Sequence, residues 1–260
     1  MTPGATAVTI DLWHTLLFLG PAEEEVYMRG QAEVAVEALD SAPPVPGATV
    51  APRSELFAIY DRVLGSAVRA SEEGRTVTPA DQFLTMAREA GRRADLPRYL
   101  AALTDLVQRT PLAQAPEGIE TLRRLHEAGH RLAVISNTVG EPGASIRPAL
   151  TREGFDPFID RYTFSDELPW TKPAPDIFLA TLRALGATPE RSVHVGDGWS
   201  DIEGARRAGY RAGVLYSGLT EYGPKYLSLF RGPGNSELSP QYTVHRLGEL
   251  PDLIDRILSS

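Results

Sequence analysis

Polar side chains stand where three apolar segments of the chain end. Asp11, Ser136 and Asp197 each come at the end of an apolar run or directly after it. A lone Asp after a strand is more often a helix cap or a turn residue. Three such ends together favour a site, because ligands bind at the carboxyl ends of the strands in doubly wound sheets. We therefore expect the three side chains to meet in one crevice.

These residue types suit chemistry on a phosphoryl group. The carboxylate of Asp11 is a competent nucleophile for phosphorus and can form an aspartyl-phosphate. Asp11 and Asp197 would repel each other unless a cation lay between them. Mg²⁺ is a hard ion that prefers oxygen ligands, so it would satisfy both carboxylates and offset the charge of a phosphate. The residues indicate phosphoryl transfer assisted by Mg²⁺.

The elements that must position these side chains are strands and helices in alternation. Strands are expected at 7–11, 131–136, 192–196, 211–216 and 242–247. Helices are expected at 117–128, around 148, at 175–185, around 203–207 and at 251–258. Strands that alternate with helices of this length imply a parallel sheet covered on both faces. The predicted fold class is α/β, with a doubly wound, Rossmann-like parallel sheet.

One long insert interrupts this alternation just after the first strand. Residues 19–110 contain only helical patterns, among them apolar residues at steps of three and four from Leu56 to Val68. Thr78-Pro79 marks the start of another helix. Its apolar stripe is expected to be Phe83, Leu84, Ala87 and Ala90. We predict a core formed by residues 1–18 and 111–260, with residues 19–110 inserted as a helical cap.

Composition excludes several classes of protein. Acidic residues outnumber basic ones by 34 to 26, which gives a net charge of -8. No basic tract occurs, so neither nucleic acid nor an anionic membrane surface is an expected partner. The sequence has no cysteine, which rules out disulfides, thiolate chemistry and a Cys-ligated zinc. No apolar run is long enough to span a membrane and no signal peptide precedes the first strand, so we expect a cytoplasmic protein.

Four segments resemble, in order, the motifs of the haloacid dehalogenase-like hydrolases. They are Asp11-Leu-Trp-His-Thr15, Ser136-Asn137-Thr138, Lys172-Pro-Ala-Pro-Asp176 and Gly196-Asp197-Gly-Trp-Ser-Asp201. The resemblance covers residues 6–16 and 111–258, with the helical insert in the expected place. Only two lysines occur in the chain, Lys172 and Lys225, which favours a functional role for the one inside a motif.

The resemblance implies a role for each motif residue. Asp11 would be the nucleophile, Ser136 and Asn137 would bind the phosphoryl oxygens, and Lys172 would neutralise them. The implied Mg²⁺ ligands are Asp11, Asp197, the backbone carbonyl of Trp13, and Asp201 as support for the metal or its water shell. A helical cap would exclude water and large polymers, so the expected substrate is a small phosphorylated metabolite.

Trp13 departs from the pattern of the phosphatases. They carry a second Asp at this position, which acts as general acid and base, and an indole cannot transfer a proton in this range. Such a group contributes ~10²–10⁴-fold to the rate, so its loss weakens phosphoryl transfer without abolishing it. His14 is a titratable neighbour. Adjacent side chains on an extended turn usually diverge, however, which favours a solvated or structural His14.

Two alternatives to a phosphatase stay open. A non-catalytic homologue that binds a phosphorylated ligand or a protein would explain Trp13, although it need not keep Asp11, Ser136, Lys172 and Asp197. Haloacid dehalogenases carry an aromatic residue where Trp13 stands, but they are metal-independent and lack the Asp197 and Asp201 pattern. Phosphonate-cleaving members need a cap lysine, and residues 17–110 contain none.

The long segment after the fourth strand is rich in aromatic residues, which are expected to pack on the core: Tyr216, Tyr222, Tyr226 and Phe230.

Overall fold

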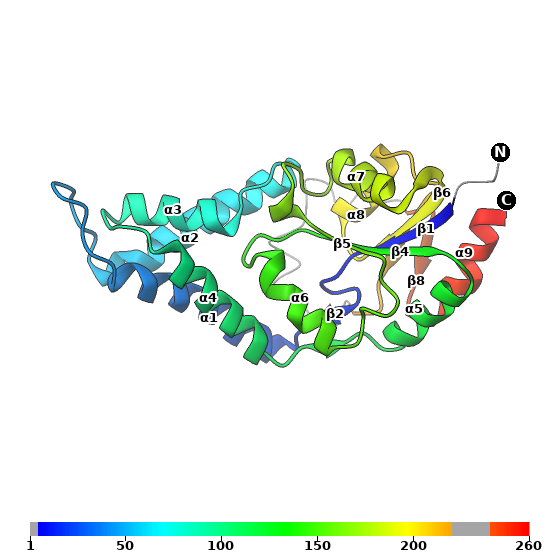
Figure 1. Ribbon diagram of the computed structural model, residues 1–260, viewed down its shortest axis with the longest axis horizontal. Helices are drawn as coiled ribbons and strands as arrows, with labels where there is room; N and C mark the ends of the chain where they lie inside the picture. The colour runs from blue at the N-terminus through cyan, green and yellow to red at the C-terminus, as the bar shows by residue number, and fades with distance from the viewer. Residues whose placement is uncertain (1–4, 220–239, 260) are drawn as a thin grey trace.

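The computed structural model describes residues 5–219 and 240–259 and contains a six-stranded parallel sheet (Figure 1). Its strands are β1 Ala5–Ile10, β4 Arg131–Ser136, β5 Arg161–Phe164, β6 Ala187–Gly196, β7 Ala212–Tyr216 and β8 Tyr242–Val244. Their order is β5-β4-β1-β6-β7-β8, and all neighbouring pairs are parallel. The chain builds outward from β1 in one direction and then in the other, so the topological switch point lies at β1. The predicted α/β fold class is confirmed.

Helices cover both faces of this sheet. On one face lie α5 Gly118–Glu127, α6 Gly143–Arg152 and α9 Leu250–Ser259, and on the other lie α7 Pro175–Leu185 and α8 Trp199–Arg207. Side chains of β1 point alternately toward the two faces of the sheet. Val8 and Ile10 pack in the core with α5 and α9, while Ala7 packs with α7 and α8. A strand buried on both sides reads as a continuous apolar run, which is why β1 could be recognised in the sequence.

The insert folds as four helices that extend to one side of the sheet (Figure 1). They are α1 Pro21–Asp40, α2 Arg53–Glu72, α3 Pro79–Glu89 and α4 Leu96–Arg109. The chain leaves the sheet through β2 Leu17–Phe18 and returns through β3 Ala113–Gln114, which pair antiparallel. Thr78 caps α3 as expected, since its side chain accepts a hydrogen bond from the backbone N–H of Asp81 at 3.1 Å.

Two local expectations are wrong. Leu84 is 43% exposed, and Met86 is buried in its place. The inward face of α3 follows steps of three and four from Phe83, which reach Met86 and Ala87 and pass over Leu84. The strand expected at 242–247 ends at Val244, because a short 3₁₀ helix, η3 Leu247–Glu249, follows it. A second 3₁₀ helix, η1 Ser165–Glu167, follows β5.

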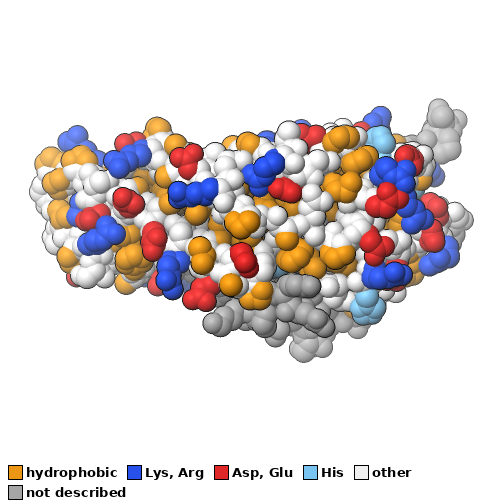
Figure 2. Space-filling model, turned by 90° about the horizontal axis from the view of Figure 1, so that it is seen from below, with side chains coloured by type: hydrophobic (Ala, Val, Ile, Leu, Met, Phe, Trp, Pro, Cys, Tyr) orange, Lys and Arg blue, Asp and Glu red, His pale blue; other side chains and the backbone are white. Residues whose placement is uncertain are grey.

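Exposed arginines lie beside acidic side chains on the described surface. Figure 2 shows blue and red side chains next to each other along one face of the molecule. On α5, for example, Arg123 pairs with both Glu120 and Glu127. Such exposed pairs add little to stability, because water screens the attraction and ordering two long side chains costs entropy. Within the described residues no helix is long and apolar enough to cross a membrane. Tyr222, Tyr226 and Phe230, which were expected to pack on the core, lie outside those residues.

Candidate active site

A tight turn after β1 holds Asp11 at the edge of the sheet. The backbone N–H of Asp11 donates to the carbonyl of Val195 in β6 at 2.8 Å. The N–H groups of Leu16 and Leu17 both donate to the carbonyl of Leu12 at 2.9 Å, which closes the turn. His14 has the positive φ of 59° that lets the chain reverse here. The turn carries the chain toward the helical insert and leaves the Asp11 side chain at the carboxyl end of the strand.

The acidic residues named from the sequence meet at this edge. One carboxylate oxygen from each of Asp11, Asp197 and Asp201 lies within 4.8 Å of the others. Asp11 ends β1, while Asp197 and Asp201 lie in the turn and first helical turn after β6. Because β1 and β6 are adjacent and in register from Ala7 to Ile10, their ends arrive together. The structure thus brings the three carboxylates into one cluster.

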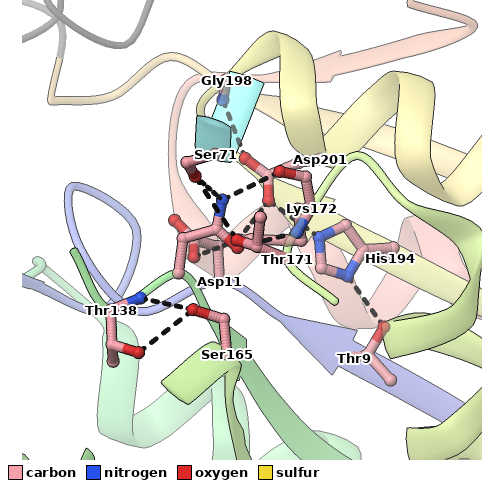
Figure 3. A network of polar contacts seen from close by, with 11 residues as sticks. Thr9, Asp11, Ser71, Thr138, Ser165, Thr171, Lys172, His194, Gly198 and Asp201 are labelled. Atoms are coloured by element: carbon pink, nitrogen blue, oxygen red, sulfur yellow. Dashed lines mark hydrogen bonds and ion pairs between the residues drawn. The ribbon is translucent and has the colours of Figure 1, made fainter. Parts of the chain in front are cut away.

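Lys172 joins this cluster from the loop before α7. Its Nζ donates to Oδ1 of Asp11 and, at 2.6 Å, to Oδ1 of Asp201 (Figure 3). The side chain is 3% exposed, so both interactions take place away from bulk water. Burial opposes charge on Lys172, but the two carboxylates outweigh it and raise the pKa of the ammonium. Lys172 therefore stays charged and compensates part of the acidic cluster.

The pKa values of the three carboxylates are shifted in different directions. Burial opposes ionisation of Asp201, yet the Lys172 ammonium and a hydrogen bond from His194 hold its pKa below the usual range. Burial raises the pKa of Asp11 to about 6, against the attraction of Lys172. Burial, followed by the charges of Asp11 and Asp201, raises the pKa of Asp197. Asp197 is the carboxylate whose charge the described residues leave least compensated.

His194 supports Asp201 from inside the sheet and was missed in the sequence. It lies in the middle of β6, is fully buried, and its Nε2 lies 3.1 Å from Oδ1 of Asp201. Its Nδ1 lies 2.8 Å from the hydroxyl of Thr9 in β1 (Figure 3). Burial lowers the pKa of His194, so the ring is neutral and Nε2 carries the hydrogen that Asp201 accepts. A single polar residue in the run Val193-His194-Val195 was the available signal.

Ser136 ends β4 and Asn137 follows it, and the two side chains have different surroundings. Ser136 is fully buried, and its Oγ has no hydrogen-bond partner among the described residues. The side chain of Asn137 is already engaged by the backbone of Lys172, accepting from its N–H at 2.9 Å and donating to its carbonyl at 3.0 Å. Asn137 therefore holds the Lys172 segment in place with its side chain. The buried hydroxyl of Ser136 is the group with capacity for a ligand.

One pocket is lined by the acidic cluster together with Lys172, Ser136 and Asn137. Its wall is formed by residues from the ends of three strands and from the β4–α6 loop: Asp11, Trp13, His14, Ser136, Asn137, Val139, Gly140, Glu141, Lys172, Asp197, Gly198, Ser200 and Asp201. Its volume is about 130 Å³. A cluster of three carboxylates, a buried ammonium and an unpartnered hydroxyl thus surround one space. Such a space suits a small anionic group together with a cation.

Comparison with known proteins assigns the family. The family model of the haloacid dehalogenase-like hydrolases matches residues 5–209, which is most of the chain. The protein belongs to this family. The match runs from β1 to the end of α8, so it includes the four motif segments and the helical insert.

Curated relatives of this haloacid dehalogenase-like hydrolase are phosphatases. The pyrophosphatase PpaX of Halalkalibacterium halodurans is 32% identical over 145 residues, or 55% of this chain and 60% of that protein. A phosphoglycolate phosphatase of Aquifex aeolicus is 35% identical over 141 residues, or 54% and 58% of the two chains. The chain thus spans less than two thirds of the length of either relative. The crystal structure of a 2-haloacid dehalogenase from Pseudomonas syringae shares the fold, with a TM-score of 0.64, 24% identity, and coverage of 97% of this chain and 99% of that one.

Trp13 stands in this family member beside a buried acid from another segment. Glu141, in the loop between β4 and α6, is 7% exposed and accepts a hydrogen bond from Nε2 of Gln31 in α1 at 2.6 Å. The side chains of Tyr27 and Trp13 also hydrogen-bond to it. Burial nevertheless raises the pKa of Glu141 to about 7. Glu141 could not be recognised from the sequence, because no strand end or motif marks it.

His14 points toward the helical insert. Its Nε2 lies 3.7 Å from a carboxylate oxygen of Glu24 in α1, and burial lowers the pKa of the ring. His14 also lines the pocket that contains Asp11. His14 therefore contacts the helical insert through Glu24. Such a contact is compatible with a structural role for this residue.

The raised pKa of Glu141 predicts a pH-dependent loss of stability. Below its ordinary pKa of 4.5 the group is protonated in both states and imposes no penalty. Between pH 4.5 and about 7 the carboxyl group of the unfolded state loses its proton while that of the folded state keeps it, so the free energy of unfolding falls and then levels off above about 7. A displacement of the pKa from 4.5 to about 7 corresponds to roughly 3 kcal/mol. Between pH 5 and pH 8 the free energy of unfolding of the wild type should therefore fall relative to that of Glu141→Gln.

Urea unfolding of both proteins across this range provides the measurement. The difference between the two unfolding free energies at each pH removes the titration of all other groups. The change of this difference with pH also removes any constant cost of placing an amide beside three donors. Parallel curves for the two proteins from pH 5 to pH 8 would show that Glu141 titrates normally.

Proposed function

We propose that this protein is a Mg²⁺-dependent phosphatase that hydrolyses a small phosphorylated metabolite through an aspartyl-phosphate on Asp11. The observation that carries the proposal is the charge of the pocket. The carboxylates of Asp11, Asp197 and Asp201 face the single ammonium of Lys172, and the unpartnered hydroxyl of Ser136 lines the same space. Fully ionised, the four charged groups sum to two negative charges, which one divalent cation would balance. We place the enzyme in the cytoplasm, where such metabolites occur.

The donor set fits Mg²⁺. Carboxylate oxygens are the ligands that this ion prefers, and it keeps several waters rather than requiring a complete cage of protein atoms. Asp11, Asp197 and the backbone carbonyl of Trp13 would hold it, with Asp201 as support. Bound there, the ion would offset the negative charge of the phosphoryl group and keep Asp11 ionised. Asp197 supports this assignment most directly, because Lys172 bonds to the other two carboxylates but not to it.

The chain's own residues perform two displacements at phosphorus. In the first, a carboxylate oxygen of Asp11 forms a bond to phosphorus while the bond from phosphorus to the substrate's leaving oxygen breaks. In the second, water attacks that phosphorus, the bond to Asp11 breaks, and inorganic phosphate leaves with the carboxylate restored. Ser136 Oγ–H would donate to a phosphoryl oxygen, and Lys172 would attract it as a point charge.

The helical insert is proposed to act as the cap of this pocket. Two of its helices, α1 and α3, contact the β4–α6 loop that lines the site, and α4 contacts the first turn of α6. Nε2 of Gln82 in α3 donates to the carbonyl of Val139 at 2.6 Å, and Nε2 of Gln108 in α4 donates to that of Ser145 at 2.9 Å. Gln31 of α1 bonds to Glu141 in the same loop. A lid tied to the pocket wall would exclude water and polymeric substrates.

One assay separates this function from its alternatives. Turnover of p-nitrophenyl phosphate and acetyl phosphate is measured with and without Mg²⁺, beside chloride release from a 2-haloacid. We expect Mg²⁺-dependent release of phosphate and no release of chloride. Chloride release without metal would establish a dehalogenase. Binding without turnover in a screen of phosphorylated metabolites would establish a non-catalytic phospho-ligand protein.

Asp197→Asn is expected to weaken Mg²⁺ binding and to lower phosphatase activity by about 10²-fold or more, because removing an anionic ligand affects the ion directly. Binding is measured independently of turnover, with Mn²⁺ as a spectroscopic substitute followed by electron paramagnetic resonance. Asp105→Asn, on the exposed face of α4, is the matched control and should bind metal as the wild type does. Unchanged Mn²⁺ affinity in Asp197→Asn would contradict the assigned metal site.

A further inference from the structure

The pocket continues beyond the acidic cluster into a narrow second compartment. Trp13, His14 and Glu141 line both spaces, and the second is completed by Leu19, Glu24, Tyr27 and Met28. With a phosphoryl group beside Asp11 and Ser136, a leaving portion directed toward the helical insert would meet these shared residues. The second compartment lies at the junction of the core with α1, since Glu24, Tyr27 and Met28 all belong to that helix.

The charge of this region is negative. Among the described residues that line the two compartments, Lys172 is the one lysine or arginine, and the acidic residues beyond the cluster of Asp11, Asp197 and Asp201 are Glu24 and Glu141. Lys172 is already bound to Asp11 and Asp201. Glu24 has His14 as a neighbour at 3.7 Å. No described lysine, arginine or histidine forms an ion pair with Glu141. Within the described part of the chain, the walls therefore hold no lysine or arginine that is available to a second anionic group on a substrate.

Glu141 has hydrogen-bonding capacity left for a ligand. A carboxylate has about four acceptor positions. Three neutral donors approach this one, from Gln31, Tyr27 and Trp13. Burying a carboxyl group without a cationic partner is costly, so such a group in a pocket is a candidate for function. The aromatic rings of Trp13 and Tyr27 beside it also favour an ammonium group.

We propose that Glu141 determines substrate specificity by accepting a hydrogen bond from an amino or hydroxyl group on the leaving portion and by excluding leaving portions that carry a negative charge. The substrate class is then a phosphate ester or anhydride whose leaving portion is neutral or cationic. A carboxylate or a second phosphate there would meet Glu141 and Glu24 together. This inference rests on the proposed function for its reaction, but its binding selectivity is testable without turnover.

The test uses three non-hydrolysable phosphonates that differ in one substituent: [3-(hydroxymethyl)benzyl]phosphonate, [3-(aminomethyl)benzyl]phosphonate and (3-carboxybenzyl)phosphonate. Their affinities for the full-length protein are measured by calorimetry at pH 8 with Mg²⁺. The wild type should bind the hydroxymethyl and aminomethyl compounds roughly 100-fold more tightly than the carboxy compound, as expected for two like charges about 5 Å apart at a protein site. An amino compound that binds more tightly than the hydroxy compound identifies an ammonium as the preferred group.

Glu141→Gln should reduce this preference to within about threefold. Glu141→Asp keeps the charge and should retain most of the preference, which separates electrostatic selection from a packing effect. Glu25→Gln, at an exposed site on α1, is the matched surface control and should select as the wild type does. Thermal unfolding of each variant shows whether it is folded.

The phosphonate affinities test selection by Glu141 independently of whether the protein hydrolyses phosphates. Selectivity in the wild type that is lost in Glu141→Gln supports the inference even if the corresponding aryl phosphates are not hydrolysed, in which case the proposed function alone fails. Equal wild-type affinity for the three phosphonates overturns it, and so does tighter binding of the carboxy compound. Failure to bind any of the three also overturns it, because a phosphoryl site beside Glu141 would then be absent.

Discussion

Asp11→Asn is expected to lower turnover of p-nitrophenyl phosphate by roughly 10⁴-fold or more while the fold stays intact. An amide oxygen does not attack phosphorus as a carboxylate does, so the covalent route is lost, and losses of this size are typical when a nucleophile is removed. The substitution is nearly isosteric, and an amide oxygen in the place of Oδ1 can still accept the hydrogen bond from Lys172. We therefore expect a folded, inactive protein.

The comparison needs a control and a direct view of the intermediate. Asp252→Asn, on the exposed side of α9, loses a surface ion pair with Arg124 and should keep the wild-type rate. Acetyl phosphate should label the wild type as a phosphoenzyme and leave Asp11→Asn unlabelled, as judged by intact-protein mass spectrometry. If wild type and Asp11→Asn hydrolyse the ester at the same rate, Asp11 is not the nucleophile.

The position of the acidic cluster could be predicted because its parts follow strands that the sequence reveals. Asp11 and Asp197 come after apolar runs, and parallel strands that are buried on both faces bring their ends to one edge. Lys172 and Ser136 came from motifs whose order along the chain indicated a common site. In each case local sequence marks an element, and the topology then determines where its end lies.

Other features depend on contacts between distant segments, and no local pattern marks them. Glu141 lies in an irregular loop, and its partner Gln31 is 110 residues earlier in α1. Asn137, whose binding of phosphate stays a prediction, bonds through its side chain to the backbone of Lys172, 35 residues away. His194 reads as a polar interruption of a core strand until the fold places it under Asp201. Pairings of this kind follow from the packing of the core against the insert.

The charges of the site also follow from packing. In the sequence Lys172 is a cation for a phosphate, whereas in the structure it is held between Asp11 and Asp201. Together these groups compensate most of the cluster and leave Asp197, whose pKa burial raises. When all three carboxylates are ionised, the cluster with Lys172 carries two negative charges, which supports the divalent cation proposed above. The hydroxyl of Ser136 lines the same pocket.

Trp13→Asp is expected to raise turnover of alkyl phosphates by ~10²–10⁴-fold, the range of a positioned acid–base group. An alkoxide is a strong base and needs a proton as it leaves, and Trp13 cannot supply one. Aryl and acyl phosphates have weakly basic leaving oxygens, so their first step should survive in the wild type. Wild-type kcat/KM should accordingly depend steeply on the pKa of the leaving group, and this dependence should flatten in Trp13→Asp.

The second displacement, hydrolysis of the aspartyl-phosphate, should also be slow in the wild type. Hydrolysis of the aspartyl-phosphate needs a base to take a proton from water, and without one it should limit the wild-type rate, so the phosphoenzyme accumulates with acetyl phosphate. Trp13→Asp should shorten its lifetime, as measured by rapid-quench kinetics. Trp13→Phe removes the indole without adding an acid and is the control for the altered cavity, so it should not raise alkyl phosphate turnover.

If the wild type hydrolyses an alkyl phosphate as fast as an aryl one, another group supplies the proton. His14 and Glu141, the titratable side chains that line the pocket beside Trp13, are then the two to replace first, because a working acid at either position would make the missing Asp dispensable.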